Sequence, residues 1–144
     1  MDTISSFSGK YAFLSNFYPC EVLLDGVVYK SVEYAYQAAK TTIFSQREKI
    51  CRAETPGQAK KLGRRLGLRL GWEEMKASVM LDLLEQKFRQ PDFRKALLET
   101  GEAELIEKNM WHDSFWGVCV CRRCGGKGNN HLGRLLMKLR EGLR

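Results

Sequence analysis

Ser31-Val32-Glu33-Tyr34-Ala35-Tyr36-Gln37-Ala38-Ala39-Lys40 is the stretch that decides how this chain is built. Ser31 is suited to cap a helix that runs from Val32 to about Thr42, and Glu33 lies in its first turn, where the helix dipole favours an anion. Tyrosine and alanine fill most of the other positions, so little of this helix has the composition of an outer surface. The stretch therefore predicts a helix with few solvent-facing positions.

Three polar residues follow one face of this predicted helix. Glu33, Gln37 and Lys40 are spaced at i, i+4 and i+7, which places them on a single stripe. A carboxylate, an amide and an amine on one stripe can grip a polar ligand and move protons. A solvated face is the alternative, because Glu and Lys are common exterior helix residues. The apolar neighbours argue for a site.

Short strands are expected on both sides of the helix. Asp25-Gly26 separates the runs Glu21–Leu24 and Val27–Tyr29, and Asp-Gly between such runs is a strong hairpin signal. Two further short strands are predicted near the C-terminal third, at Glu104–Glu107 and Phe115–Val120.

Helices make up most of the remaining chain. Thr55-Pro56-Gly57-Gln58 opens one, with a capping Thr and Gln three residues apart and Pro at the first helical position. Gly63 and Gly67 interrupt it and predict close packing or a break. Further helices are expected over Trp72–Phe88, over Asp92–Glu99 and, capped by Asn130, over the leucine-rich C-terminal stretch. The pattern predicts one compact, mainly α-helical α+β domain over residues 1–144, with a small sheet and a hairpin.

Composition and charge narrow the class of protein. Of the 144 residues, 44% are hydrophobic and 28% are charged, which suits a packed core and argues against disorder. The net charge of +7 favours anionic partners such as phosphates, nucleotides or nucleic acid. No run has the length of a membrane helix and no basic-then-apolar leader precedes the first motif. We expect a cytoplasmic protein with no membrane partner, and the oligomeric state stays open.

The cysteines suggest a metal rather than disulfides. An odd count of five, without a leader, argues against a disulfide framework. Cys119, Cys121 and Cys124 form C-x-C-x-x-C, and thiolates at that spacing can converge on one soft metal ion. Structural zinc is bound by four ligands, and Cys20 or His131 is the candidate for the fourth ligand. The alternative is that Cys119 and Cys121 alternate on a strand as small buried hydrophobes.

Two neighbouring stretches near the C-terminus have the composition of a ligand site. Residues 106–117 combine two carboxylates, Asn109, His112 and two tryptophans, and an indole ring suits stacking on a base or sugar. Residues 125–134 are glycine-rich and basic and open a helix, so their backbone amides would form a phosphate cradle. A flexible turn is the alternative for the second stretch, and a solvated basic face is the alternative for the charges around it.

Several motifs in order resemble the NADAR (YbiA-like) family. They are Phe13-Leu14-Ser15-Asn16-Phe17, the stretch Ser31 to Lys40, Trp116-Gly117 and Gly128-Asn129-Asn130-His131-Leu132-Gly133, with Ala53–Lys61 and Leu105–Asn109 fitting the same pattern. The resemblance runs from about Phe7 to Arg140. It implies a mainly helical α+β domain with a central polar cleft, and N-glycosidase activity. Some members act on phosphorylated ribosylamino intermediates of riboflavin synthesis, and others remove ADP-ribose from guanine in nucleic acid.

The resemblance also implies roles for individual residues. Glu33 matches the catalytic glutamate, Lys40 matches the lysine that ends the same motif, and Asp113 fills the acidic position before Trp-Gly. The expected substrate-binding residues are Phe17, Gln37, Trp72, Trp116, Gly117, Asn129 and Asn130. Many members have His where this chain has Tyr34, which puts a histidine-dependent proton step in doubt. The cysteine insertion belongs only to some relatives.

The favoured hypothesis is an N-glycosidase that cleaves the C–N bond between a phosphorylated ribose and an amino-pyrimidine or guanine base. ADP-ribose on guanine in nucleic acid is the expected substrate, and the chemistry requires no cofactor. Glu33 would stabilise the positive ribose ring with Asp113 as second carboxylate, and Lys40 would bind phosphate or attack the sugar. The alternatives are a riboflavin-intermediate N-glycosidase, a non-catalytic module for ADP-ribose or nucleic acid, and a zinc-stabilised interaction surface.

Overall fold

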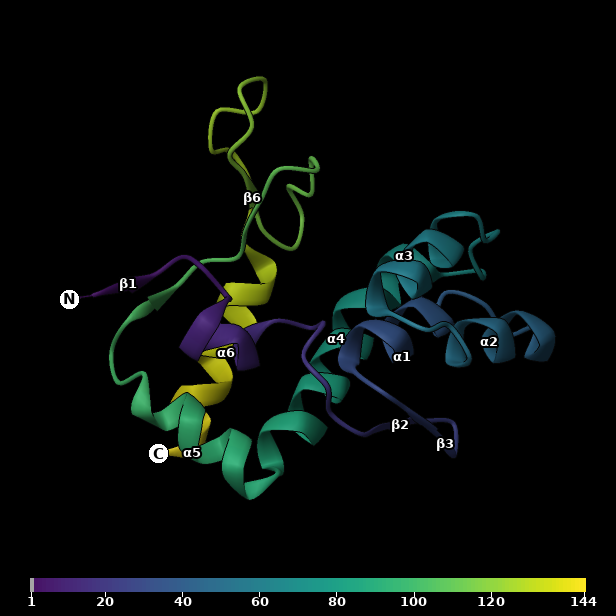
Figure 1. The fold of residues 1–144 in the computed structure, drawn as a ribbon, viewed down its shortest axis with the longest axis horizontal. Helices are drawn as coiled ribbons and strands as arrows, with labels where there is room; N and C mark the ends of the chain where they lie inside the picture. The colour runs from purple at the N-terminus through teal and green to yellow at the C-terminus, as the bar shows by residue number, and fades with distance from the viewer. Residues whose placement is uncertain (1) are drawn as a thin grey trace. The chain divides into compact units, whose positions relative to one another are not determined.

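The computed structural model describes residues 2–144 and divides them into two compact units. The continuous unit is Asn16–Gln90; the discontinuous unit joins residues 2–15 to Pro91–Arg144. Over the described residues the chain forms seven helices and six strands of two or three residues (Figure 1). The predicted mainly helical α+β class is confirmed. In this part of the chain, no helix combines the length and the apolar character that a bilayer crossing requires.

Helix α1 (Val32–Ala38) is the centre of the continuous unit. All seven of its residues are buried, and α2 (Phe44–Cys51), α3 (Pro56–Arg64) and α4 (Trp72–Arg89) all contact it (Figure 1). The hydroxyl of Ser31 accepts the Tyr34 N–H at 3.5 Å, so the predicted cap is confirmed. The helix is shorter than expected and ends at Ala38 rather than near Thr42.

The predicted hairpin is confirmed as β2 (Val22–Leu24) paired antiparallel with β3 (Val27–Tyr29). Asp25 and Gly26 join the strands with positive φ angles of 48° and 81°. A two-residue turn of this kind needs the left-handed region at both positions, which Asp tolerates and Gly adopts freely. The hairpin contacts α1 and α4 and so closes one side of the continuous unit.

Helix α3 begins as predicted, with Pro56 at its start and the Thr55 hydroxyl accepting the Gln58 N–H at 3.1 Å. Its two glycines differ. A Cβ built on Gly63 would lie 1.8 Å from Oε1 of Gln37, so the missing side chain allows α3 to pack directly against α1. Gly67 lies beyond the end of α3, and a Cβ added there would have no neighbour within 4 Å. Gly63 therefore allows close packing, whereas Gly67 lies after the helix has ended.

The discontinuous unit is built from η1 (Gly9–Leu14), α5 (Pro91–Glu99) and α6 (His131–Leu143) with two pairs of very short parallel strands. Strand β1 (Thr3–Ile4) pairs with β4 (Glu104–Leu105), and β5 (Lys108–Asn109) pairs with β6 (Val118–Cys119). Figure 1 shows the β5–β6 segment extending beyond the N-terminal end of α6.

The strand predictions in this unit were too long and missed two partners. The expected strands over residues 104–107 and 115–120 contain only β4 and β6 as regular structure. Strands β1 and β5 had no sequence signal, because two residues cannot show alternation and each pairs with a segment distant in the chain.

Candidate active site

Glu33 is a buried carboxylate fixed by both its backbone and its side chain. Only 6% of the residue is exposed. Its N–H donates to the carbonyl oxygen of Asn16 at 3.0 Å, and its Oε1 accepts the Nε2–H of Gln37 at 3.2 Å. The i, i+4 spacing on α1 brings the side chains of Glu33 and Gln37 together, as the sequence predicts. Glu33 is therefore held in one orientation in a region of low dielectric.

Gln37, which donates the hydrogen bond to Glu33, is itself closely packed. Its side chain is 4% exposed, and its Oε1 is buried with no conventional hydrogen-bond partner. A Cβ on Gly63 would lie 1.8 Å from that oxygen, so the amide packs directly against the glycine. A carboxylate oxygen only accepts hydrogen bonds, so the amide turns its Nε2–H side to Glu33. Gln37 is a positioning residue for the carboxylate.

Lys40 lies in the turn after α1, not on the helix itself. Its N–H donates to the Gln37 carbonyl at 3.3 Å and its carbonyl accepts the Arg69 N–H at 2.8 Å, so the turn is anchored on both sides. The Nζ lies 5.7 Å from the centroid of the Tyr36 ring. Burial is the main cause that lowers the pKa of Lys40. Glu33 opposes this shift and neighbouring cations add to it.

Those cations form a basic group around Lys40. Arg64 and Lys60 on α3 and Lys76 on α4 all act electrostatically on the Lys40 amine. Lys60 also lies 5.9 Å from the centre of the Phe17 ring, and Lys76 pairs with Glu73 at 2.7 Å. A buried carboxylate beside several cations suits a ligand that combines a cationic transition state with phosphate groups. Lys60 and Lys76 were not predicted as site residues, because their only signal in the sequence was net charge.

The two aromatic candidates of the continuous unit differ in exposure. Phe17 is 39% exposed and offers a ring face, whereas Trp72 is 4% exposed. The Trp72 ring lies 5.3 Å from that of Tyr36 at an interplanar angle of 54°, which is a packing contact in the core. Trp72 thus supports α1, and its predicted place beside a ligand stays a prediction.

In the discontinuous unit, Asn109 organises the loop that follows β5. Asn109 is buried, and its Oδ1 accepts the N–H groups of Trp111 at 3.2 Å and Asp113 at 3.1 Å. Its Nδ2 donates to the Asp113 carbonyl at 2.8 Å and to the Glu107 carboxylate at 3.3 Å. One amide side chain therefore sets the path of the loop.

Asp113 continues this organisation toward the predicted Trp-Gly motif. Its Oδ1 accepts the N–H groups of Phe115 at 3.2 Å and Trp116 at 2.9 Å, which is a local turn-forming pattern. The Trp116 ring meets that of Phe115 edge-on, at 4.8 Å and 86°. Asp113 holds the position of Trp116, and its role as second carboxylate stays a prediction.

Glu107 is a carboxylate near this motif that was not predicted as a site residue. A Cβ on Gly117 would lie 1.7 Å from its Oε2 and 2.3 Å from its carbonyl oxygen, so Gly117 is required by this contact. Its signals in the sequence were its place in the motif Leu105–Asn109 and its count as one of the two carboxylates in residues 106–117. Glu107 joins Asp113 as an acidic group beside the Trp116-Gly117 turn.

The start of α6 does not form the predicted phosphate cradle. The N–H groups of Asn129, Asn130, His131 and Leu132 donate to the carbonyl oxygens of Ser114, Gly117, Phe115 and Trp116, respectively. These amides already have protein acceptors, so they are not available to a phosphate. The expectation of an anion site at these four amides was wrong, because the chain folds back on its own aromatic loop there.

Asn130 occupies the N-cap position of α6 without capping it by its side chain. Its φ of 51° is left-handed, and its Oδ1 accepts the Glu107 N–H at 2.9 Å while its Nδ2 donates to the Leu105 carbonyl at 2.9 Å. The side chain thus ties α6 to the β4–β5 connection. The predicted N-cap position is confirmed, although the side chain makes no capping hydrogen bond. The ligand-binding roles of Asn129 and Asn130 stay predictions.

A second kind of cluster lies at the tip of the same unit. The Nδ1 of His112 and the Sγ atoms of Cys119, Cys121 and Cys124 all lie within 4.8 Å of one another, a grouping that is able to hold a metal ion. The pKa of Cys121 is lowered to about 6, chiefly because the Cys124 N–H donates to its sulfur. The pKa of Cys124 is raised to about 12 through the hydrogen bonds it makes to the sulfurs of Cys119 and Cys121.

The fourth residue of this cluster is not one of the two residues that we predicted as the fourth metal ligand. Cys20 or His131 was the expected fourth ligand, whereas the structure brings His112 to the three cysteines. The His131 ring packs on Phe115 at 4.3 Å, and Cys20 belongs to the continuous unit, where Gln90 donates to its sulfur at 3.3 Å. His112 follows β5 and the cysteines begin on β6, so the pairing of these strands creates a relation that spacing alone does not reveal.

Known proteins resemble this chain over almost all of its length. Residues 5–144 match the NADAR domain. The chain is 38% identical over 148 residues to the protein named N-glycosidase YbiA of Shigella boydii, covering 99% of this chain and 89% of that protein. It is 38% identical over 136 residues to a riboflavin biosynthesis protein of Vibrio vulnificus, covering 92% of this chain and 36% of that protein, about a third of its length.

A solved structure has the same fold. The NMR structure of the Escherichia coli protein YbiA superimposes with a TM-score of 0.79 and 37% identity, covering 98% of this chain and 83% of that one. The family match extends over both units and includes Glu33, Lys40 and the Trp116-Gly117 turn. The chain therefore belongs to the NADAR family.

Proposed function

We propose that this protein hydrolyses the bond between C1′ of a phosphorylated ribose and the nitrogen of a base, and that its substrate is ADP-ribose attached to guanine in nucleic acid. Relatives that carry the name N-glycosidase support the reaction class, a hydrolase acting on N-glycosyl bonds. The observation that carries the proposal is the buried Glu33 carboxylate, oriented by Gln37 and accompanied by the amine of Lys40.

The chemistry of the bond requires such a carboxylate. Breaking an N-glycosidic bond develops positive charge on the ribose ring, and a fixed negative charge in a dry site stabilises it. Glu33 meets both conditions, because it is 6% exposed and held by hydrogen bonds at its backbone and its Oε1. The departing base takes up a proton, and water supplies the hydroxyl group that ends on C1′.

Lys40 and its neighbours supply the second half of the proposal. The lowered pKa of Lys40 increases the fraction of neutral amine, the form that attacks carbon. In that route the Nζ bonds to C1′ as the bond to the base breaks. Ring opening then gives an iminium that water hydrolyses. The basic side chains of Lys60, Arg64 and Lys76 act electrostatically on this amine and suit the phosphates of the substrate.

The overall charge supports a polyanionic substrate. A net charge of +7 favours association with nucleic acid over a small neutral ligand. A phosphorylated ribosylamino intermediate of riboflavin synthesis is the second candidate substrate, because a relative from Vibrio vulnificus carries a riboflavin biosynthesis name. Both molecules present a phosphorylated ribose joined to a nitrogen of a related ring.

The deciding experiment is a product assay on DNA that carries ADP-ribosyl-guanine. The wild-type chain is expected to release free ADP-ribose, and Glu33→Gln to lose roughly 10²–10³-fold in kcat, because one transition-state contact is removed. Glutamine retains an oxygen that can accept the Gln37 N–H, so the fold should persist, as circular dichroism would check. Glu74→Gln, at an exposed position of α4, is the matched control with full activity.

Each other outcome contradicts a defined part of the proposal. Full activity in Glu33→Gln would remove Glu33 from the mechanism. No release by folded wild-type protein would exclude this substrate, and the same assay on the ribosylamino phosphate would then test the second candidate. Stoichiometric binding of modified DNA without release would instead identify a non-catalytic binding module.

A further inference from the structure

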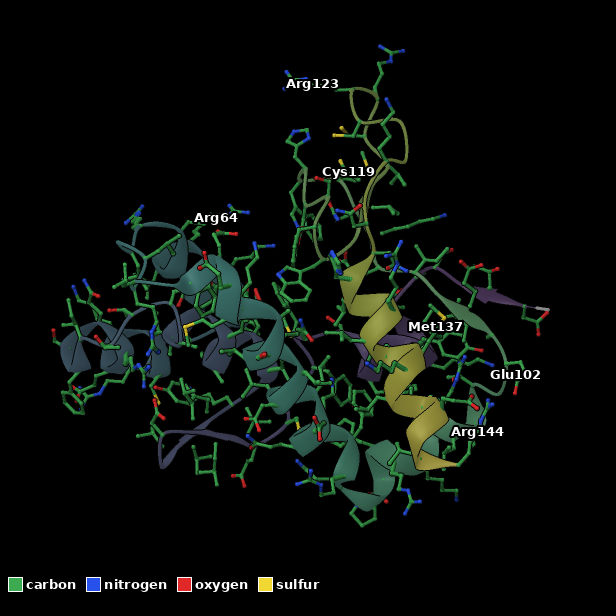
Figure 2. All side chains as sticks on the ribbon, turned by 180° about the vertical axis from the view of Figure 1, so that it is seen from behind. Arg64, Glu102, Cys119, Arg123, Met137 and Arg144 are labelled. Carbon is green, nitrogen blue, oxygen red and sulfur yellow. The ribbon has the colours of Figure 1, made fainter. Side chains whose placement is uncertain are left out.

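We propose that His112, Cys119, Cys121 and Cys124 bind one Zn²⁺ ion as a closed, structural Cys₃His site. The ligands would be Nδ1 of the histidine and the three Sγ atoms, which lie within 4.8 Å of one another. Figure 2 shows sulfur atoms gathered in this loop, between the labelled Cys119 and Arg123. The proposal concerns the loop itself and does not depend on the proposed glycosidase activity.

The three distances from the histidine nitrogen to the cysteine sulfurs match the edges of a tetrahedron around zinc. With Zn–N near ~2.1 Å and Zn–S near ~2.3 Å, a nitrogen and a sulfur on one tetrahedron are about 3.6 Å apart. The Nδ1 of His112 lies 3.3 Å from the sulfur of Cys124, 3.5 Å from that of Cys121 and 3.7 Å from that of Cys119. All three separations lie within a few tenths of an ångström of the tetrahedral edge.

Hydrogen bonding does not account for three such contacts at one nitrogen. An imidazole Nδ1 carries either one proton or one lone pair, so it forms one strong hydrogen bond in the ring plane. Here three sulfurs approach the same nitrogen at 3.3–3.7 Å. A cation at the centre of the group would contact all four atoms at once.

The backbone between the cysteines has the form of a metal-binding turn. The Cys124 N–H donates to the Cys121 sulfur at 3.3 Å, an outer interaction that stabilises a thiolate ligand. The Gly125 N–H closes the turn on the Cys121 carbonyl at 2.9 Å, and Gly125 has a positive φ of 63°. A glycine permits that angle directly after the last cysteine. The turn therefore presents both sulfurs to one side.

The other two ligands are brought in by the β5–β6 pair. Cys119 lies opposite Asn109 in this pair and is fully buried, and its N–H donates to the Lys127 carbonyl at 3.0 Å. His112 follows Asn109 in the loop and has a positive φ of 69°, which is uncommon for a residue other than glycine. Such an angle persists where the surroundings enforce it, and a metal bond at Nδ1 would do so.

Four protein ligands leave no position for a reactive water, so the ion would be structural. It would join the loop after β5 to the turn after β6. Asp113 and Trp116 lie within the segment closed by His112 and Cys119. Three thiolates and a neutral imidazole around Zn²⁺ carry a net charge of −1, which the adjacent Arg122 and Arg123 would balance.

The test begins with metal analysis of the untagged full-length chain, expressed with zinc in the medium and purified under reducing conditions. We expect one zinc per chain. Replacement by Co²⁺ should give the intense visible absorption of a tetrahedral cobalt site together with sulfur-to-cobalt charge transfer. Cys121→Ser and His112→Ala should lose stoichiometric metal and this spectrum, whereas Cys51→Ser and His131→Gln should keep both, since these residues lie outside the cluster.

Metal-free wild-type protein makes the test independent of whether the variants fold. Chelated and reduced chain should regain one Co²⁺ or Zn²⁺ with the same spectrum and with a higher melting temperature. Absence of metal in the purified chain together with a six-coordinate cobalt spectrum would overturn the proposal. So would iron in place of zinc, a disulfide among the three cysteines in the freshly reduced and repurified chain, or an unchanged spectrum in His112→Ala.

Discussion

The two units position their candidate residues by different physical means. In the continuous unit, α1 is buried by three helices and a hairpin, and helix packing fixes Glu33 and Gln37. In the discontinuous unit, Asp113 and Trp116 lie in a loop between two-residue strands, and single polar side chains fix them, chiefly Asn109. Packing tolerates the loss of one contact better than a loop held by a few hydrogen bonds does. The comparison therefore predicts different responses to substitution.

The largest expected effect is at Lys40, where a conservative change separates two mechanisms. Arginine keeps the positive charge and binds phosphate, but it does not form an iminium with a sugar. If Lys40 attacks C1′, Lys40→Arg should lose roughly 10³-fold or more in kcat. Borohydride should trap a protein–ribose adduct in the wild type, detected by mass spectrometry and absent from the variant.

Lys60→Arg is the matched control, because Lys60 lies in the same basic group and has no proposed covalent role. It should retain the adduct. Near-normal turnover in Lys40→Arg, with no trapped species in the wild type, would limit Lys40 to phosphate binding. In that case the whole contribution of the continuous unit would be electrostatic.

The same contrast explains how much of the molecule was predictable. The Ser31 cap, the Asp25-Gly26 hairpin and α4 follow from signals within a few residues, and all three are confirmed. The pairing of Gln37 with Glu33 follows from helical spacing and is also present. Where the backbone is regular, local sequence is enough to place side chains relative to one another.

The loop after β5 could not be predicted in the same way. His112 as the fourth member of the cysteine cluster depends on the pairing of β5 with β6, two strands too short to show a pattern. The amides at the start of α6 carried a phosphate-site signal, yet the chain itself supplies their acceptors. Both results depend on contacts between segments distant in the chain, which local composition does not encode.

Two glycines, one in each unit, allow a direct comparison. Gly117→Ala would place a Cβ 2.3 Å from the Glu107 carbonyl oxygen, so backbone must move, and a loss of about 3 kcal/mol in unfolding free energy is expected. Gly63→Ala meets the side chain of Gln37 at 1.8 Å. The Cδ and Cβ of Gln37 lie 2.7 Å and 3.1 Å from the same position, so the whole Gln37 side chain must swing away. A side chain moves more easily than a backbone carbonyl and the helix gains about 1 kcal/mol from alanine, so the net loss should be smaller.

Gly63→Ala should affect activity more than it affects stability. Moving the Gln37 side chain breaks its hydrogen bond to Glu33, so Gly63→Ala should lower kcat while the melting temperature changes little. Gly67→Ala and Gly142→Ala have nothing within 4 Å of the new Cβ and serve as controls. Equal losses of stability at Gly63 and Gly117 would contradict the distinction between the two units.

The smallest expected effect concerns the dry interior of the continuous unit. Lys87 on α4 is fully buried, and burial lowers its pKa to about 7. In the unfolded chain a lysine titrates near ~10.4, so between these values the unfolded state binds more protons. The free energy of unfolding should therefore rise with pH through this range, by about 2 kcal/mol between about pH 7 and about pH 9.

Denaturant titrations of the wild type and Lys87→Met at both pH values measure this contribution. Lys87 and the Cys20 thiol act on each other electrostatically, so the difference between the two curves reports Lys87 together with its effect on Cys20. Lys87→Met should remove the rise, whereas Lys61→Met, at an exposed position of α3, should keep it. If the free energy of unfolding rises equally in Lys87→Met, Lys87 does not cause the rise. Water would then reach this lysine in the wild type, and helix packing in this unit would exclude solvent less completely than the buried positions around α1 indicate.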